Sequence, residues 1–462
     1  MRVHDWTGRQ VDWSLVVRAG AAAVAAVVAF AGCSSVMPGA LDGGADGDAG
    51  AGSASRTGAG PGVTADSVKV VFVGVDLKAT ASVTGFKTAD AGDPARQVKA
   101  LETWVNANGG IAGRKLVAVY RNYEAADDSP AAEERLCNQI TQDDKAFAVV
   151  LTGQFQSNAR PCYASRRTLV LDATLVANDQ TTFTRLAPYL WSASYPDYDE
   201  FVRAFLGSLE QQGYFTGAAK AGVVAADTPT NRSAYERLAV PQLQRLNVTP
   251  TVAWIDTTDL GTLNAGLNQA AVDFRAKGVE RVFFLGGARM ASFFLTVAAA
   301  QSFTARYALS SFDNPSFLVN NPATIPREGL RGAVGIGFNP SQDVPDSAYP
   351  FPGTDAERAC LDIFAAAGQT FATRENARVA FPYCDAALLL RAGARNLGAD
   401  LNAAAWAQDA RALGTRFRPA TGFAGLLGPG RFSAANGYRA LAYDGGCGCF
   451  AYQGEEVPFA AR

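Results

Sequence analysis

The apolar residues of this chain follow two alternating patterns from Val68 onward. Short continuous apolar runs, such as Val70 to Val75, alternate with longer segments whose apolar residues recur at helical spacing. A continuous apolar run is typical of a strand buried on both faces, and helices between such strands indicate a parallel sheet. The first expected helix begins at Asp93, an N-cap residue, followed by Pro94 in its first turn. The pattern therefore predicts an α/β protein.

The alternation runs through the chain twice, in two series of about 120 residues each. In the first series the predicted strands are Val70 to Val75, Lys115 to Tyr120, Phe147 to Leu151 and Thr168 to Leu171. In the second the predicted strands are Gly222 to Ala226, Thr251 to Trp254, Val282 to Leu285 and Tyr307 to Ser310, and the predicted helices are Glu200 to Gln211, Arg232 to Leu246, Leu263 to Lys277 and Arg289 to Ala300. The chain then adds helices Asp355 to Ala367 and Pro382 to Leu397 and a final strand-like segment, Tyr438 to Tyr452. Two such series predict two doubly wound lobes.

The N-terminus has the layout of an export signal. Arg2, Arg9 and Arg18 precede an uncharged apolar stretch that ends at Ala31, too short to span a bilayer but long enough for a signal-peptide core. The stretch leads into Cys33 in a setting that resembles the bacterial lipobox, although Phe30 stands where leucine is usual. We therefore expect residues 1–32 to be a lipoprotein signal peptide and Cys33 to be the lipidated N-terminus. The alternative is a buried cysteine after an alanine-rich helix.

Residues 33–64 are rich in Gly, Ala, Ser and Asp, so they bury too little surface to fold and are expected to form a flexible tether. A lipid and a tether would hold the folded part at the extracytoplasmic face of the bacterial membrane, anchored only by the lipid. The net charge of −2 gives no basic excess, so we expect no nucleic-acid partner.

Candidate chemistry is limited by the histidine count. The only histidine, His4, lies in the segment expected to be removed, which excludes Ser-His-Asp and Cys-His pairs and the commonest metal ligand. No Walker A, Gly-x-Ser-x-Gly or dinucleotide-binding motif is present. We expect no catalytic residue, no metal and no cofactor. A carboxylate-dependent hydrolase is the remaining enzyme hypothesis, and Asp172 lacks an identifiable second acid.

Six cysteines remain after Cys33, an even number in an exported chain, and we expect all six to be structural. Sequence order favours the local pairs Cys137 with Cys162 and Cys360 with Cys384. Pairing of Cys447 with Cys449 is less favoured because only Gly448 separates them. The alternative for these two is a metal or redox pair, and no nearby cysteine or histidine completes a metal ligand set.

Three segments carry a family resemblance. They are Trp104 to Leu116 (WVNANGGIAGRKL), Phe283 to Gly287 (FFLGG) and Leu426 to Phe432 (LLGPGRF). In this order and spacing they resemble the Leu/Ile/Val-binding type I periplasmic binding proteins, the substrate-binding components of ABC transporters. The resemblance extends from about Val68 to the C-terminus.

The resemblance implies two lobes joined by three hinge crossings, with a ligand cleft between them. Lobe 1 would comprise residues 65–196 and 339–429, and lobe 2 residues 197–338 and 430–462. It also implies a monomer that binds a small-molecule solute and delivers it to ABC permease and ATPase subunits. The alternatives are a ligand sensor or cell-envelope docking lipoprotein with the same fold, and the hydrolase.

Ligands of open parallel sheets bind beyond the carboxyl ends of strands, so the segments after the strands supply the candidate residues. Amino-acid binders of the family hold the ligand carboxylate with hydroxyls and backbone amides, and Thr174 matches such a threonine. The expected acid of lobe 2 is absent at the matching position, and Arg289 adds a cation, which favours an uncharged polar or anionic ligand such as an amide or organic acid over an ordinary α-amino acid. The candidate ligand-binding residues are Thr152, Gln154, Phe155, Ala173, Thr174, Asn231, Arg289, Ser311 and Asp313.

Overall fold

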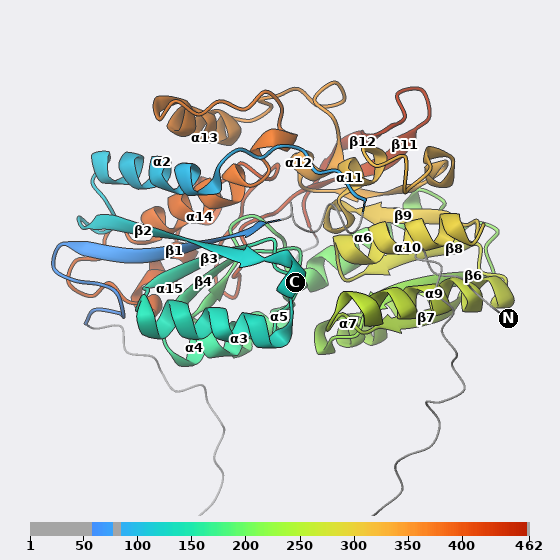
Figure 1. The fold of residues 1–462 in the computed structure, drawn as a ribbon, viewed down its shortest axis with the longest axis horizontal. Coiled ribbons are helices and arrows are strands. Elements are labelled where there is room, and N and C mark those ends of the chain that lie inside the picture. The colour runs from blue at the N-terminus through green and yellow to red at the C-terminus, as the bar shows by residue number, and fades with distance from the viewer. Residues whose placement is uncertain (1–57, 77–84, 460–462) are drawn as a thin grey trace, which may run out of the picture. The chain divides into compact units, whose positions relative to one another are not determined.

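The computed structural model describes residues 58–76 and 85–459, and these form two sheets (Figure 1). The expected signal peptide and Cys33 lie outside the described residues. Residues 58–64, at the end of the expected tether, lie against the fold: the Gly60 amide donates to Leu401 O (2.8 Å) and the Lys69 amide to Gly62 O (3.0 Å). No helix in the described part of the chain is long and apolar enough to cross a membrane.

The first sheet has five parallel strands in the order β2-β1-β3-β4-β5. Its strands are β1 (Ser67–Asp76), β2 (Lys115–Glu124), β3 (Ala148–Thr152), β4 (Leu169–Ala173) and β5 (Leu190–Trp191). Its helices are α2 (Pro94–Ala107), α3 (Pro130–Asn138), α4 (Arg160–Ser165), α5 (Gln180–Arg185), α13 (Asp355–Ala366), α14 (Ala380–Gly393) and α15 (Ala403–Arg411). α2, α13 and α14 pack together on one face, and α3 and α4 lie on the other (Figure 1).

The second sheet repeats this order and extends it. Strands β7-β6-β8-β9-β10 are parallel, and β11 and β12 continue the sheet antiparallel at one edge. These strands are β6 (Lys220–Ala226), β7 (Thr249–Ile255), β8 (Arg281–Leu285), β9 (Arg306–Ser310), β10 (Val334–Gly337), β11 (Tyr438–Asp444) and β12 (Cys449–Val457). The helices are α6 (Tyr198–Gln211), α7 (Pro229–Ala234), α8 (Val240–Arg245), α9 (Leu260–Lys277), α10 (Ala288–Ala300), α11 (Pro315–Val319) and α12 (Pro340–Asp343).

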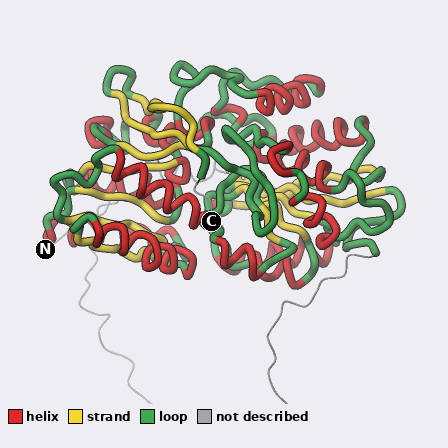
Figure 2. Tube along the Cα trace, turned by 180° about the vertical axis from the view of Figure 1, so that it is seen from behind, coloured by secondary structure: helices red, strands yellow, loops and turns green. Residues whose placement is uncertain are grey.

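The second sheet is buried on both faces. Along β8, Val282 and Phe284 pack into an apolar cluster with α9 and α10, whereas Phe283 and Leu285 pack into another with α6. Successive strand residues point to opposite faces, so a strand between two helical layers must be apolar throughout. Figure 2 shows helices on either side of the strands from behind. The predicted parallel α/β architecture is therefore confirmed.

The structure also corrects several predicted elements. The expected helix Arg232 to Leu246 is interrupted by a π-turn at Tyr235–Ala239. This turn ends two residues before Pro241, whose missing N–H cannot join the helical hydrogen bonds. The final strand-like segment is a hairpin of two strands. Strands β5 and β10 and helices α5, α11, α12 and α15 were not expected.

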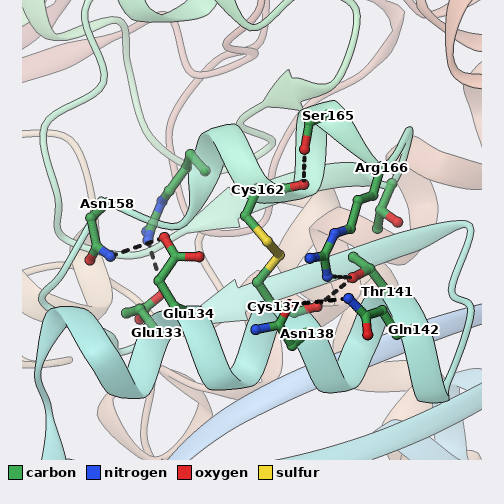
Figure 3. Close-up of a disulfide and its surroundings, with 12 residues drawn as sticks. Glu133, Glu134, Cys137, Asn138, Thr141, Gln142, Asn158, Cys162, Ser165 and Arg166 are labelled. Atoms are coloured by element: carbon green, nitrogen blue, oxygen red, sulfur yellow. Dashed lines mark hydrogen bonds and ion pairs between the residues drawn. A yellow bond between two sulfur atoms is a disulfide. The ribbon is translucent and has the colours of Figure 1, made fainter. Parts of the chain in front are cut away.

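All six remaining cysteines are paired, as Cys137–Cys162, Cys360–Cys384 and Cys447–Cys449. The first two pairs were predicted. Figure 3 shows Cys137 of α3 joined to Cys162 of α4, with Thr141 donating to Cys137 O (2.7 Å) and accepting from Arg166 (2.8 Å). Both pairs cross-link separate helices over 24 or 25 residues. The third pair, the less favoured one, closes within a hairpin turn.

Candidate functional site

The carboxyl ends of the two sheets lie against each other. In each sheet the strand order changes direction at one point, between β1 and β3 in the first sheet and between β6 and β8 in the second. In doubly wound folds, ligands bind beyond the carboxyl ends of the strands at such a point. Gln154 and Phe155 follow β3 in the first sheet. Asn231 lies in α7 after β6, and Arg289 in α10 after β8. These four predicted residues therefore come from the two reversal points.

Arg289 connects the two sheets at these reversal points. Its guanidinium lies 3.8 Å from the centroid of the Phe155 ring, and its Nη1 forms an ion pair with Asp128 Oδ2 (2.8 Å). Burial lowers the pKa of Arg289, and the charge of Asp128 opposes this effect. Burial raises the pKa of Tyr123, so its hydroxyl stays protonated and donates to Asp128 Oδ1 (2.9 Å). The positive charge of Arg289 is thus neutralised within the protein.

Two further contacts hold the sides together. Gln156 Nε2 donates to Thr257 O (2.9 Å), which joins the loop after β3 to the loop after β7. Gly287, before α10, has a φ of +85°, and a Cβ built on it would lie 2.6 Å from Leu175 O. Only glycine permits this backbone approach. The two lobes are therefore in contact through these loops.

Three side-chain amide atoms of Gln154 and Asn231 are buried without hydrogen-bond partners in the part of the chain that the structure describes. Gln154 is 0% exposed, and neither Nε2 nor Oε1 has a partner among the residues that the structure describes. Asn231 is also buried; its Nδ2 donates to Ala226 O (3.0 Å), but its Oδ1 has no partner in the same ranges. A buried polar group left without a hydrogen bond costs about 1–3 kcal/mol. A bound molecule with complementary donors and acceptors would remove that cost.

The hydroxyl of Thr174, by contrast, is engaged in a buried network. It donates to Asp172 Oδ1 (2.7 Å) and accepts from Arg160 Nη2 (3.1 Å). Arg160, 1% exposed, also donates to Asp172 Oδ2 (3.0 Å) and approaches Glu133 (3.4 Å). Burial raises the pKa of Glu133 to about 7, and the charge of Arg160 opposes this shift. This network fixes the end of β4, at which Ala173 also lies.

Thr152 is similarly engaged, because its hydroxyl donates to Val73 O (2.7 Å) in the neighbouring strand. The two remaining predicted residues lie where the chain leaves β9. Ser311 donates to Asp343 Oδ2 (2.9 Å) and accepts from the Phe338 amide (2.7 Å). Asp313 accepts from the Ser310 amide (2.8 Å), and burial raises the pKa of Asp313 to about 8.

Sequence reasoning missed Asp128 and Arg160. Asp128 follows β2 through a short 3₁₀ turn, and it reaches Arg289 only because the two sheets meet. Nothing in the sequence around Arg160 distinguishes it from the many exposed arginines. Within residues 58–76 and 85–459, no group of three or more His, Cys, Asp or Glu side chains could hold a metal ion.

No protein-family model matches the sequence, and a search of curated proteins finds no match. Solved structures do match. A branched-chain amino acid ABC transporter protein from Thermus thermophilus with bound valine has a TM-score of 0.56 and 16% identity, covering 86% of this chain and 98% of that one. A solute-binding protein from R. palustris in complex with 4-hydroxybenzoate has a TM-score of 0.58 and 13% identity, covering 85% and 97%.

A third similar structure is a fatty acid ABC transporter substrate-binding protein from Thermomonospora curvata, with a TM-score of 0.57 and 14% identity over 87% of this chain and 93% of that one. These TM-scores establish the fold, and at such low sequence identities they do not identify the ligand of this chain. The expected fold is confirmed: this chain has the type I periplasmic binding protein fold, shared with Leu/Ile/Val-binding-like ABC transporter substrate-binding proteins.

Proposed function

We propose that this chain is a lipid-anchored extracytoplasmic solute-binding protein of an ABC importer that binds a small polar or anionic molecule between its lobes. The observation that carries this proposal is that, within the described ranges, buried amide atoms lack hydrogen-bond partners on both sides: both side-chain polar atoms of Gln154 in lobe 1, and Oδ1 of Asn231 in lobe 2. An amide pair supplies donors and acceptors without charge. Binding, rather than catalysis, is what such groups support.

Charge balance favours an uncharged ligand over an anion. Arg289 is the cation among the candidate ligand-binding residues, and Asp128 already pairs with it. An anion would have to displace Asp128 and leave that carboxylate buried without its partner, which is costly. A carboxamide or another neutral hydrogen-bonding molecule would leave the ion pair intact.

A thermal-shift screen against amides, organic acids, amino acids, sugars and aromatic acids tests this proposal. A ligand at 100 times its Kd stabilises the folded state by about 2.7 kcal/mol. We expect coherent hits among neutral polar compounds. Gln154→Leu and Asn231→Leu should each weaken binding about tenfold or more, the equivalent of one lost hydrogen bond, whereas Gln211→Leu at an exposed position should not.

Asp128→Asn separates the two ligand classes, because it frees Arg289 while keeping a side chain of similar size. Tighter binding of anions by this variant, with no change for neutral compounds, would show that Arg289 can serve as an anion site. If no compound shifts the melting temperature of the unmodified protein, the solute-binding proposal fails.

The anchor has its own test. A Cys33→Ala variant should move from the membrane pellet to the soluble extracytoplasmic fraction, because it lacks the thiol that would carry the lipid. A variant that stays in the pellet would contradict lipid anchoring without affecting the solute-binding proposal.

A further inference from the structure

The turn between β11 and β12 carries a disulfide unlike the other two. Cys447 and Cys449 are two positions apart, whereas the other pairs are separated by 24 and 25 residues. Cys447 is exposed and Cys449 is 8% exposed. Cys360 and Cys384, by comparison, are buried in the apolar core of the first sheet.

The hairpin does not depend on this disulfide for its register. β11 and β12 pair from Tyr438 to Asp444 along one strand, with Asp444 opposite Cys449. The turn is closed by hydrogen bonds from the Gly448 amide to Asp444 O (2.9 Å) and from the Gly446 amide to Asp444 Oδ1 (2.7 Å). A cross-link over one intervening residue also restricts the unfolded chain far less than one over 24 residues. Stabilisation therefore explains this disulfide poorly.

Both cysteines and Gly448 line a cavity of about 330 Å³. Further walls come from Ser316 and Val319 of α11, from its C-cap residue Asn320, and from residues 344–347. A cavity of this size can admit a small molecule. The disulfide is thus accessible from a shaped space rather than from open solvent alone.

One arginine of this cavity lies against the disulfide turn. A Cβ built on Gly448 would lie 2.8 Å from Nη1 of Arg327, so the guanidinium covers the backbone between the two cysteines. Arg327 is exposed, its Nη2 lies 3.5 Å from Val319 O, and it forms no ion pair within the described ranges. The acids of the cavity have other partners: Asp346 pairs with Arg374 (3.2 Å), and Glu375 accepts from Asn320 (3.1 Å). A nearby cation favours the thiolate form of cysteine.

We propose that the Cys447–Cys449 disulfide is a thiol–disulfide exchange site for a low-mass thiol that enters this cavity, an activity separate from solute binding. The thiolate of the small molecule attacks Sγ of exposed Cys447, a mixed disulfide forms, and the bond between Sγ of Cys447 and Sγ of Cys449 breaks. The electron pair goes to Cys449, whose thiolate is stabilised by Arg327. A second small thiol then attacks the mixed disulfide and releases Cys447. Two thiols become one small disulfide, and their two protons pass to the protein dithiol.

The test treats the full chain with L-cysteine near pH 7.5, traps free thiols with iodoacetamide and locates them by peptide mass spectrometry. We expect alkylation at Cys447 and Cys449, while the four other cysteines stay paired. Cys449→Ser should accumulate a mixed disulfide with L-cysteine at Cys447. Reduction of Cys360–Cys384 at an equal rate, or no reduction of Cys447–Cys449, would overturn the proposal.

Arg327→Met tests the role of the cation, with Arg331→Met at a nearby exposed position as its matched control. Arg327→Met should slow exchange, because a leaving thiol of higher pKa leaves more slowly, and it should move the pH midpoint of alkylation of the reduced protein upward. Arg327→Lys should restore both in part. Equal behaviour of the Arg327 and Arg331 variants would overturn the assignment of Arg327. Gln154→Leu should leave exchange unchanged, so failure here is separable from failure of the solute site.

Discussion

The polar groups around Arg160 and the amide of Gln154 are equally buried, yet their hydrogen bonding differs. Arg160 is surrounded by Asp172, Thr174 and Glu133, each of which contacts it. Gln154 contacts no hydrogen-bonding group among the described residues. Because folded proteins rarely leave buried polar groups unpaired, the first arrangement indicates scaffold and the second indicates a site for something outside the chain. Burial alone therefore does not distinguish a structural polar group from a ligand-binding one. The presence or absence of hydrogen-bond partners within the protein does.

The largest effect is expected at Arg160. Arg160→Leu would leave the carboxylate of Asp172 buried without its cation, and removing one partner of a buried pair costs about 3–5 kcal/mol. Urea unfolding followed by fluorescence should show this loss in the free energy of unfolding. Arg135→Leu, which removes an exposed ion pair with Asp127, should cost less than about 1 kcal/mol. Equal losses in the two variants would mean that the Arg160 network is not scaffold.

The second effect is a pH dependence of stability from Asp313, which is smaller per pH unit than the loss at Arg160. Burial raises its pKa to about 8 in the folded protein, above the value of about 4 in the unfolded chain. A raised carboxyl pKa means that the folded state holds the proton more tightly, so this contribution is present below about pH 4 and is lost as the pH rises toward 8. Stability should therefore fall by up to about 1.4 kcal/mol per pH unit in this window. Asp313→Asn should reduce the slope of the profile measured by thermal unfolding; an unchanged slope would contradict this prediction.

A smaller effect is expected at Thr174. Thr174→Val removes the hydroxyl that bridges Asp172 and Arg160 but keeps the shape, which should lower the free energy of unfolding by about 1–2 kcal/mol. Thr181→Val, at an exposed position of α5, should change it by less than about 0.5 kcal/mol. If Thr174→Val instead weakens ligand binding without lowering the stability of the free protein, the threonine belongs with Gln154.

The smallest effect should be at Gln154, and its sign should be opposite. Gln154→Leu removes two unpaired buried polar atoms, so the free protein should be unchanged or more stable by up to about 1 kcal/mol while ligand binding falls. Calorimetry of the same sample with and without ligand measures both quantities. A large loss of stability would show that Gln154 has a structural role, as Arg160 does, and would contradict its assignment to the ligand site.

The sequence predicted the strands that are buried on both faces, because helices cover both sides of β8 and its buried positions 282–285 are all apolar. It also predicted helix α2 to begin after Asp93, whose side chain accepts from the amides of Ala95 and Arg96. Strand β10 was missed because it contains Gly335, which is unfavourable in an isolated strand. A Cβ there would lie 1.6 Å from Leu309 O, so only the neighbouring strand explains the glycine.

For the site, too, part of the arrangement was predicted from the sequence and part was decided only by the tertiary structure. The order of strands and the loops after them, both readable from the sequence, selected Gln154, Asn231 and Arg289 from the chain. Tertiary structure decided their roles, since Arg289 is neutralised by Asp128 from the other sheet, and the hydroxyl of Thr174 is engaged by Arg160. Local patterns record which face of an element is buried, but a hydrogen-bond partner more than a few turns away in sequence leaves no local pattern. For that reason the sequence determined the fold class and the candidate residues, and only the folded chain decided which polar groups remain free to bind.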